Sequence, residues 1–422
     1  MIVRKGMVGM AAAVLAMGSS AWANDATTQP VASQVSVSPI SADLSTEKPL
    51  QQEMDKAGIK NLPFSIQGFV EAGYMYDTSS PRIADGPTFN GYDAYKNRLE
   101  LANADLQIIR TPTASGTKFD WGFTLEGGYG SDYTFIHSNG MMDNRAGVSP
   151  QNQSDIDQAF LSFNIPVLSG VTLNVGKFFT PLGYEVFDDG GNPLYSHSYA
   201  FLYAIPVTQT GITAQTTFGN WEVLAGITRG WDQSLKDSNG DPDFLGQVIY
   251  TPNKTWNVTA NLSEGPEAPH IVGPADDGIG HGDDSHWWTV LDLVGHYNFS
   301  DQLTFGAGAD YGDAPHDKFA SSTGAAEWYG VTGYAGYTIN SYLTANARLE
   351  WYDDTDGATL AGVHTSVYSA TAGVTIKPLP NSDIFQYLEI RPEVRYDYST
   401  KPIFDSGDHG QFNLASDVIM QF

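Results

Sequence analysis

The chain has 422 residues, with 48 Asp and Glu against 21 Lys and Arg, and a formal net charge of −27. So much negative charge argues against nucleic-acid binding, which needs basic patches, and the lack of cysteine excludes disulfide frameworks and thiol catalysis. Only 16% of the residues are charged, below the roughly 25% of ordinary soluble domains, whereas 12% are aromatic. This composition, with its 44 glycines, favours an extended β architecture.

Residues 1–23 have the features of a secretory signal peptide. Arg4 and Lys5 give a positive start, residues 7–17 are apolar and mostly small, and Ala21-Trp22-Ala23 fits the cleavage rule. No later stretch has the roughly 18 to 20 consecutive apolar residues of a spanning helix. Residues 24–62 are rich in Ser, Thr, Gln and Pro, and we expect a periplasmic N-terminal arm or linker with a short helix over 50–59.

From Ser65 onwards, apolar and polar residues alternate with a period of two. The clearest case is 388–398, where Glu389, Arg391, Glu393 and Arg395 alternate with mostly apolar residues. Such alternation predicts strands with one apolar and one polar face. The second segment changes phase near 101–103, which predicts a β-bulge. We find sixteen such segments, at 65–76, 98–110, 118–129, 156–165, 171–180, 208–218, 220–230, 244–250, 255–263, 286–298, 302–311, 327–338, 341–352, 365–377, 386–398 and 411–422.

The connections between these segments alternate strictly between long and short. Outer-membrane barrels have this order, with short periplasmic turns and long external loops, and a sheet in lipid must close because its edge groups find no partners there. The sequence therefore predicts an all-β fold over 63–422: a transmembrane antiparallel up-and-down β-barrel of about 16 strands. Counts of fourteen or eighteen stay open, because the segments at 156–165 and 244–250 are the least clearly defined. The long connections are 77–97, 130–155, 181–207, 231–243, 264–285, 312–326, 353–364 and 399–410.

Aromatic residues near the strand ends are expected to form two interfacial girdles. The last segment ends on Phe422 and resembles the C-terminal signal that bacterial barrels present to the barrel-assembly machinery, although Ser416 interrupts its apolar phase. The girdle residues are Trp121, Trp221 and Trp256 at one end and Tyr76, Tyr129, Trp351 and Tyr398 at the other.

Several motifs resemble those of the OmpL-like family of outer-membrane β-barrel porins. The resemblance spans most of the chain after the signal peptide and is densest between Arg98 and Glu267. It implies a pore-forming protein of the bacterial (Gram-negative) outer membrane rather than an enzyme. The motifs are Asn97-Arg98-Leu99 leading to Ala104-Asp105-Leu106-Gln107, Asp157-Gln158-Ala159-Phe160-Leu161, Val175-Gly176-Lys177-Phe178-Phe179-Thr180-Pro181-Leu182-Gly183-Tyr184-Glu185, Pro206-Val207-Thr208-Gln209-Thr210-Gly211, Gly230-Trp231-Asp232 and Glu264-Gly265-Pro266-Glu267.

The polar strand faces of a sixteen-stranded barrel would line an aqueous channel and set its selectivity. We expect the third long connection, 181–207, to fold inward as a constriction, by analogy with general porins; the alternative places it over the mouth. The charges of the wall either act on solutes or only pair with one another. The pore-lining and constriction candidates are Glu71, Arg98, Glu100, Glu126, Glu185, Asp188, Asp189, Arg348, Glu350, Glu389, Arg391, Glu393 and Arg395.

The expected function is transport by passive diffusion of small hydrophilic solutes or ions, with a weak preference for cations. In the long connections Asp and Glu greatly outnumber Lys and Arg, which would concentrate cations at one mouth. The same carboxylates could instead bind divalent cations that bridge lipopolysaccharide. Outer-membrane lipid and the transported solutes are the other expected partners. Two alternatives stay open: an outer-membrane barrel hydrolase, and a non-conducting structural or adhesin barrel.

No strong metal or catalytic motif is present. Residues 237–243 begin like a calcium loop, but Pro242 and Val248 stand where an EF-hand needs Gly and Glu. A plain external turn is the preferred interpretation, and we expect no cofactor other than divalent cations at external loops. The weak metal candidates are Asp237, Asn239, Asp241 and Asp243, and also His281 and His286 beside Asp283 and Asp284.

Overall fold

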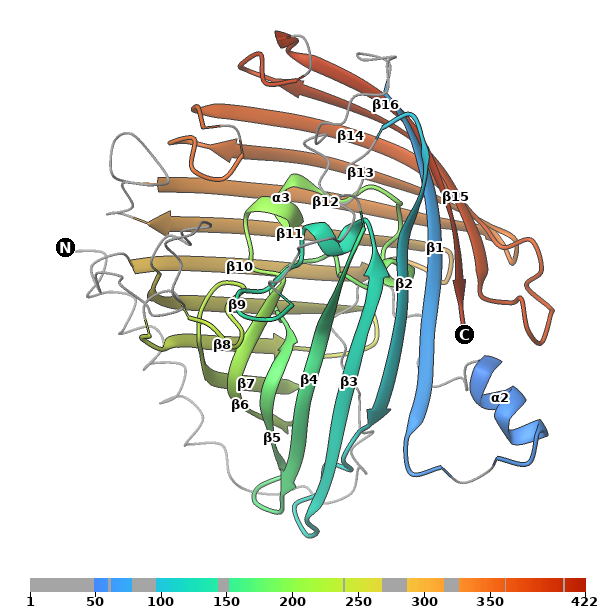
Figure 1. Ribbon diagram of the computed structural model, residues 1–422, viewed down its shortest axis with the longest axis vertical. Coiled ribbons are helices and arrows are strands. Elements are labelled where there is room, and N and C mark those ends of the chain that lie inside the picture. Colours follow the sequence, from blue (N-terminus) through green and yellow to red (C-terminus); the bar gives the residue numbers. More distant parts are fainter. Residues whose placement is uncertain are drawn as a thin grey trace. The chain divides into compact units, whose positions relative to one another are not determined.

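The chain folds into a closed antiparallel barrel of sixteen strands, each paired with its neighbour in sequence, and β1 pairs with β16 to close the sheet (Figure 1). The computed structural model describes residues 49–59, 62–77, 96–142, 152–237, 240–267, 287–314, 326–360, 362–404 and 407–422. All sixteen predicted strands are confirmed, and no end is shifted by more than three residues. The strands are β1 (Ser65–Asp77), β2 (Leu99–Arg110), β3 (Asp120–Gly130), β4 (Gln153–Ile165), β5 (Val171–Phe179), β6 (Thr208–Phe218), β7 (Trp221–Thr228), β8 (Asp243–Tyr250), β9 (Trp256–Pro266), β10 (Trp287–Asn298), β11 (Leu303–Ala314), β12 (Ala326–Asn340), β13 (Leu343–Asp354), β14 (Thr365–Ile376), β15 (Leu388–Ser399) and β16 (Gly410–Gln421).

Helical segments in the described ranges are short. They are α2 (Pro49–Lys56), α3 (Tyr199–Tyr203) and two single 3-10 turns, η1 (Asp132–Thr134) and η2 (Asp189–Gly191). Helix α2 corresponds to the helix predicted over 50–59. No helix in the ranges that the structure describes is long and apolar enough to cross a membrane. The predicted signal peptide, 1–23, lies outside the described residues.

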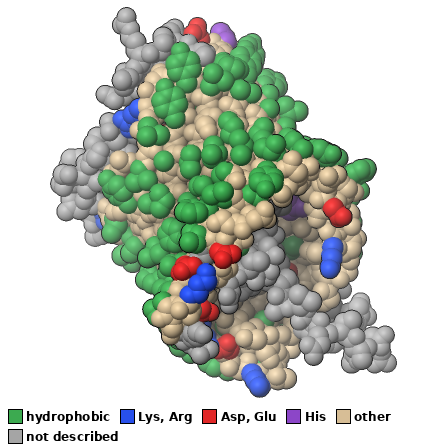
Figure 2. Space-filling model, turned by 90° about the vertical axis from the view of Figure 1, so that its right-hand side faces the viewer, with side chains coloured by type: hydrophobic (Ala, Val, Ile, Leu, Met, Phe, Trp, Pro, Cys, Tyr) green, Lys and Arg blue, Asp and Glu red, His purple; other side chains and the backbone are tan. Residues whose placement is uncertain are grey.

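The two faces of each strand differ as the alternation predicts. On β15, Val394 and Tyr396 are exposed on the outer wall, whereas Arg391, Glu393 and Arg395 are buried on the inner face. Hydrophobic side chains cover the outer wall over a broad continuous area, and charged side chains appear at its margin (Figure 2). An apolar outer wall suits lipid, because the closed sheet leaves no strand edge to be solvated.

Two local features fix the register around β1. Glu71 lies opposite Asn103 while the next residue, Ala72, lies opposite Leu101, so Ala102 is the extra residue of a bulge. The predicted bulge in this segment is therefore confirmed, and it turns both Ala102 and Asn103 towards the buried side. At the other edge of β1, the main chains of Phe422 and Gly68 exchange two hydrogen bonds of 2.9 Å, which extend the seam to the last residue.

All seven predicted girdle residues are exposed on the outer wall near strand ends. Trp221 stacks on Tyr250 with ring centroids 4.3 Å apart, and Tyr250 contacts Trp256 at 5.7 Å. These three rings come from consecutive strands at one end of the barrel. Their position fits an interfacial belt, where an aromatic ring meets both lipid and water.

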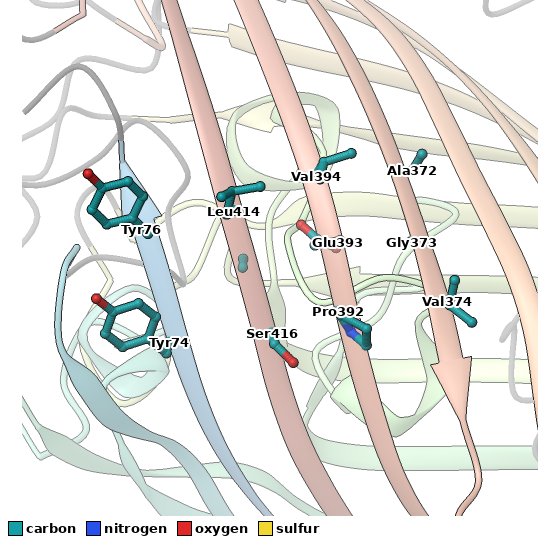
Figure 3. Close-up of a pocket in the computed structure, with 11 residues that line it drawn as sticks. Tyr74, Tyr76, Ala372, Gly373, Val374, Pro392, Glu393, Val394, Leu414 and Ser416 are labelled. Carbon is teal, nitrogen blue, oxygen red and sulfur yellow. The ribbon is translucent and has the colours of Figure 1, made fainter.

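An open apolar hollow lies on the outer wall, across the neighbouring strands β14, β15, β16 and β1 (Figure 3). Tyr74 and Leu414 border it, and Pro392 lies on its floor. The β14–β15 ladder skips two pairs beside Pro392, between the pairs Gly373–Glu393 and Ile376–Ile390. Proline has no N–H to donate, which accounts for a gap in a ladder at this place.

Candidate functional site

The third long connection, 181–207, hereafter L3, folds inward and lies against the inner wall. Its main chain is held from several strands that are far apart in sequence. The amide of Gly183 donates to Asp292 on β10 over 3.1 Å, and that of Ala200 donates to Glu350 on β13 over 2.8 Å. Figure 1 shows helix α3 of L3 within the ring of strands. L3 therefore takes the inward course expected from the sequence rather than a course over the mouth.

L3 has a small apolar core of its own. Ser198 caps α3 by accepting a hydrogen bond from the amide of Phe201 at 3.1 Å. Phe201 and Ile205 are buried in one cluster with Trp328 of β12, and the Trp328 indole donates to the carbonyl of Ala204 over 3.1 Å. A hydrophobic contact thus anchors the loop inside a barrel whose inner face is mostly polar.

The central ion pair of the site joins L3 to β13. Arg348 donates to Glu185 over 2.7 Å, and both side chains are almost fully buried. Glu185 also accepts from Tyr334 at 3.0 Å and from the amide of Ser198 at 2.7 Å. Burial would raise the pKa of Glu185, but Arg348 and then His197 outweigh it and hold this pKa below its usual value. Glu185 is therefore a buried anion that accepts hydrogen bonds from donors of L3, β12 and β13.

Two arginines of β15 hold the main chain of L3. Arg391 donates to the carbonyls of Asp189 and Asn192 at 2.7 and 2.9 Å, and Arg395 donates to the carbonyl of His197 at 2.7 Å. On the same strand, Glu393 accepts from the amide of Tyr195 at 2.9 Å. A guanidinium group offers several donors in a rigid fork, which suits it to hold two carbonyls at once.

Glycines on the inner wall make room for the tyrosines of L3. A Cβ atom on Gly306 of β11 would stand 2.1 Å from the ring of Tyr184, and one on Gly73 of β1 would collide with the hydroxyl of Tyr195. Tyr184 stacks between Tyr334 and His296, with centroid distances of 3.9 and 4.9 Å. Glycine is needed at these positions because the tyrosine side chains lie so close to the strand backbone that no Cβ atom fits. The backbone conformation itself does not require glycine there.

Most of the candidate residues from the sequence lie on the inner face. Arg348, Glu350, Arg391, Glu393 and Arg395 all contact Glu185 or the main chain of L3. Arg391 and Arg395 also form ion pairs with carboxylates of the strands. Glu71, Glu100 and Glu126 are buried on the inner faces of β1, β2 and β3, and Asp189 is buried within L3.

Three candidates lie apart from this convergence. Glu389 pairs with the partly exposed Lys377 at 3.1 Å, near a short turn. Arg98 lies just before β2, and Asp188 is half-buried in L3. Any effect of these residues on solutes stays a prediction.

The weak metal candidates are not brought together in the described part of the chain. Asp237 accepts from the amide of Gly240 at 2.9 Å and lies 3.6 Å from Arg229, as in an ordinary turn. Asp243 is buried at the start of β8, and Asp241 is only partly buried. The remaining candidates, Asn239, His281, Asp283, Asp284 and His286, lie outside the described residues.

A second polar cluster was not predicted from the sequence. Tyr133 of η1 donates to Asp157 of β4 at 2.8 Å and to Asp105 of β2 at 3.2 Å. Lys177 of β5 lies 3.4 Å from Asp155. The alternation places these strand residues on polar faces, but only the folded loop brings Tyr133 to them.

The comparisons with known proteins agree with this geometry. Residues 63–422 match the family described as "Putative beta-barrel porin-2, OmpL-like". No curated protein sequence matches the chain. Among solved structures, the anion-selective porin from Comamonas acidovorans is similar at 13% identity and a TM-score of 0.56, covering 85% of this chain and 99% of the other.

Two further porin-type structures show the same fold. OmpT, an outer membrane protein of Vibrio cholerae, is similar at 11% identity and a TM-score of 0.52, covering 86% of this chain and 99% of its own. OmpF of Salmonella typhi is similar at 12% identity and a TM-score of 0.52, covering 85% and 97%. At such low identity these likenesses establish the barrel fold alone.

Proposed function

Because this chain belongs to the OmpL-like family of β-barrel porins, we propose that it carries small hydrophilic solutes and ions across the outer membrane by passive diffusion. The family and the matched structures are porins, which are channels and not enzymes. The observation that carries the proposal is the inward L3, held by charged and polar groups of the inner wall. A polar lumen narrowed by such a loop favours small, hydrated solutes.

We further propose a weak preference for cations. Among the described residues, buried Asp and Glu side chains outnumber buried Lys and Arg several times, and the whole chain carries −27. Fixed negative charge on the low-dielectric walls of a water-filled channel attracts cations and repels anions. The selectivity of the Comamonas porin is a property of that protein, and 13% identity supports no transfer to this chain.

Planar-bilayer recordings of the purified barrel test both parts. We expect discrete conductance steps. In a gradient of potassium chloride, we expect a reversal potential with the sign that shows a higher permeability for potassium than for chloride. A reversal potential set by chloride would end the cation proposal while leaving the pore intact. Bilayers that stay silent, together with no sugar uptake into proteoliposomes, would favour a non-conducting structural barrel.

The C-terminal residue supports a further part of the proposal, assembly into the outer membrane. Phe422 pairs with Gly68 through its main chain and so completes the β1–β16 seam. A terminal aromatic at the closing strand is suited to recognition by the barrel-assembly machinery before the seam closes. Contact of the external carboxylates with lipopolysaccharide through divalent cations stays a prediction.

A further inference from the structure

A row of polar side chains crosses four neighbouring strands of the inner wall at one level. Its members, each directly opposite the next in the strand register, are Gln247 of β8, Asn261 of β9, Asp292 of β10 and Asp310 of β11. All four are buried, with exposed fractions of 4 to 8%. Side chains directly opposite each other on one face of a sheet lie close enough to interact.

The hydrogen bonds along this row run in one direction and hold the start of L3. Nε2 of Gln247 donates to Oδ1 of Asn261 over 2.9 Å and to the carbonyl of Pro181 over 3.2 Å. The side-chain amide of Asn261 donates in turn to Oδ1 of Asp292. The same oxygen of Asp292 accepts from the main chain of Gly183 at 3.1 Å. The row therefore fixes Pro181 and Gly183, close to where L3 leaves β5.

The last link of the row lacks a donor. Oδ2 of Asp292 and Oδ1 of Asp310 are both buried without a hydrogen-bond partner in the part of the chain that the structure describes. The two carboxyl groups nevertheless lie within hydrogen-bonding reach of each other. Two ionised carboxylates cannot bond to each other, because a carboxylate only accepts. One proton between them satisfies both oxygens at once.

The charges around the pair lead to the same conclusion. No Lys, Arg or His side chain among the described residues forms an ion pair with Asp292 or Asp310. Two negative charges on opposite side chains at this depth would repel each other strongly. Two carboxyl groups that meet in this way share one proton, because both cannot ionise together.

Neighbouring titratable groups do not supply a positive charge. Those that face Asp310 from other elements are Glu350 and Tyr352 of β13, Tyr334 of β12 and, from L3, Tyr184 and Glu185. None of them is a cation. Glu185 is paired with Arg348, and the carboxyl of Glu350 acts on Asp310 as a further negative charge.

We propose that Asp310 keeps a proton and donates it, as a hydrogen bond from Oδ1, to Oδ2 of Asp292. The negative charge of the pair stays on Asp292, because Asn261 and Gly183 donate to this residue. Asp310 accepts no hydrogen bond from another described residue. Asp310 is thus a positioning residue for L3, since it fixes the carboxylate that holds the amide of Gly183.

This role has a consequence for conduction, which rests on the proposed diffusion function. When alkaline pH removes the shared proton, Asp292 and Asp310 become two adjacent charges and repel each other. Asp292 then leaves the row, and the start of L3 loses the acceptor of Gly183. The open channel should therefore become noisier as the pH rises.

Infrared spectroscopy of the folded barrel in detergent tests the proton directly, because protonated carboxyls and carboxylates absorb at different frequencies. Asp310→Asn keeps a donor for Asp292 but cannot ionise. At neutral pH it should lack one carboxylic-acid band of the wild type and keep all the carboxylate bands. The double variant Asp292→Asn, Asp310→Asn should lose one band of each kind. Asp301→Asn, in an exposed short turn next to β11, is the matched control and should lose a carboxylate band only.

Single-channel recordings at different pH test the positioning role. Wild type and Asp301→Asn should gain open-channel noise on the alkaline side, whereas Asp310→Asn should stay quiet over the same range. Asp310→Leu, which offers no donor, should be noisy at every pH. Heat-dependent mobility on gels verifies that each variant is folded.

Loss of a carboxylate band in folded Asp310→Asn, in place of an acid band, would show that both carboxyls are ionised and would overturn the proposal. Loss of two acid bands in the double variant would equally overturn it. An alkaline response that is the same in wild type and Asp310→Asn would refute the positioning role. The spectra require no conduction, so silent bilayers would count against the diffusion function and not against the shared proton.

Discussion

The substitution Glu185→Gln isolates the charge that fixes L3 to β13. It keeps the size of the side chain and one oxygen, but it leaves Arg348 buried without its anion. Glu185 also accepts from Tyr334 and from the amide and hydroxyl of Ser198, at 3.0, 2.7 and 3.0 Å. A neutral amide oxygen accepts hydrogen bonds less strongly than a carboxylate oxygen. The amide N–H₂ group is a donor, so it cannot pair with the donors that face the second carboxylate oxygen.

Removing one partner of a buried ion pair costs about 3 to 5 kcal/mol, so the ratio of displaced to docked L3 should rise by a factor between roughly 10² and 4 × 10³. L3 keeps its contacts with Arg391 and Arg395, so we expect frequent partial displacement rather than release of the whole loop. A matched control is Glu389→Gln, because its partner Lys377 is 42% exposed and such pairs contribute about 0 to 1 kcal/mol.

Single-channel recordings give the readout. Glu185→Gln should show added open-channel noise and a higher mean conductance, and Glu389→Gln should match the wild type. Acid should produce the same change in the wild type. The folded-state pKa of Glu185 lies below its usual value of 4.5, so its stabilising contribution is present above that value and is lost as the pH falls through the folded-state pKa. Wild-type noise and amplitude in folded Glu185→Gln would show that the Glu185–Arg348 pair does not hold L3 in place.

Three further perturbations follow from the packing. Gly306→Ala should displace the ring of Tyr184 and change conductance with no change of charge, whereas Gly333→Ala, with open space around its Cβ, should be silent in the same recordings. Deletion of Phe422 removes two main-chain hydrogen bonds from the seam and should lower the yield of folded barrel on gels; an unchanged yield would show that the seam does not need it. Burial raises the pKa of Asp232 to about 6, so this carboxyl destabilises the fold increasingly as the pH rises towards that value. The melting temperature of Asp232→Asn, relative to wild type, should therefore rise between about pH 4 and pH 7, and a pH-independent difference would contradict this.

The strand pattern is the part of the fold that the sequence reveals most fully. Alternation within 388–398 assigns Arg391, Glu393 and Arg395 to one face, and the structure buries all three on the inner wall. The phase change near 101–103 predicts the bulge at Ala102. Both results depend on local geometry, because successive side chains of a strand point to opposite faces whatever the strand pairs with.

Contacts between the loops and the wall are not readable in this way. The sequence marks Glu185, Arg348 and Arg391 as candidates but does not indicate that both arginines hold L3. It gives no sign that Tyr133 reaches Asp157, or that the Asn103 amide is buried with no hydrogen-bond partner among the described residues.

From the sequence alone come the strand segments, their outward apolar face and the closure of the sheet, with fourteen to eighteen strands allowed, because period-two patterning is a local property and lipid permits no open edge. Only the tertiary structure decided which buried charges meet. Such meetings join residues such as Glu185 and Arg348, which are 163 positions apart. Their pairing depends on the course of L3 and on the register of every strand between them, which no local pattern specifies.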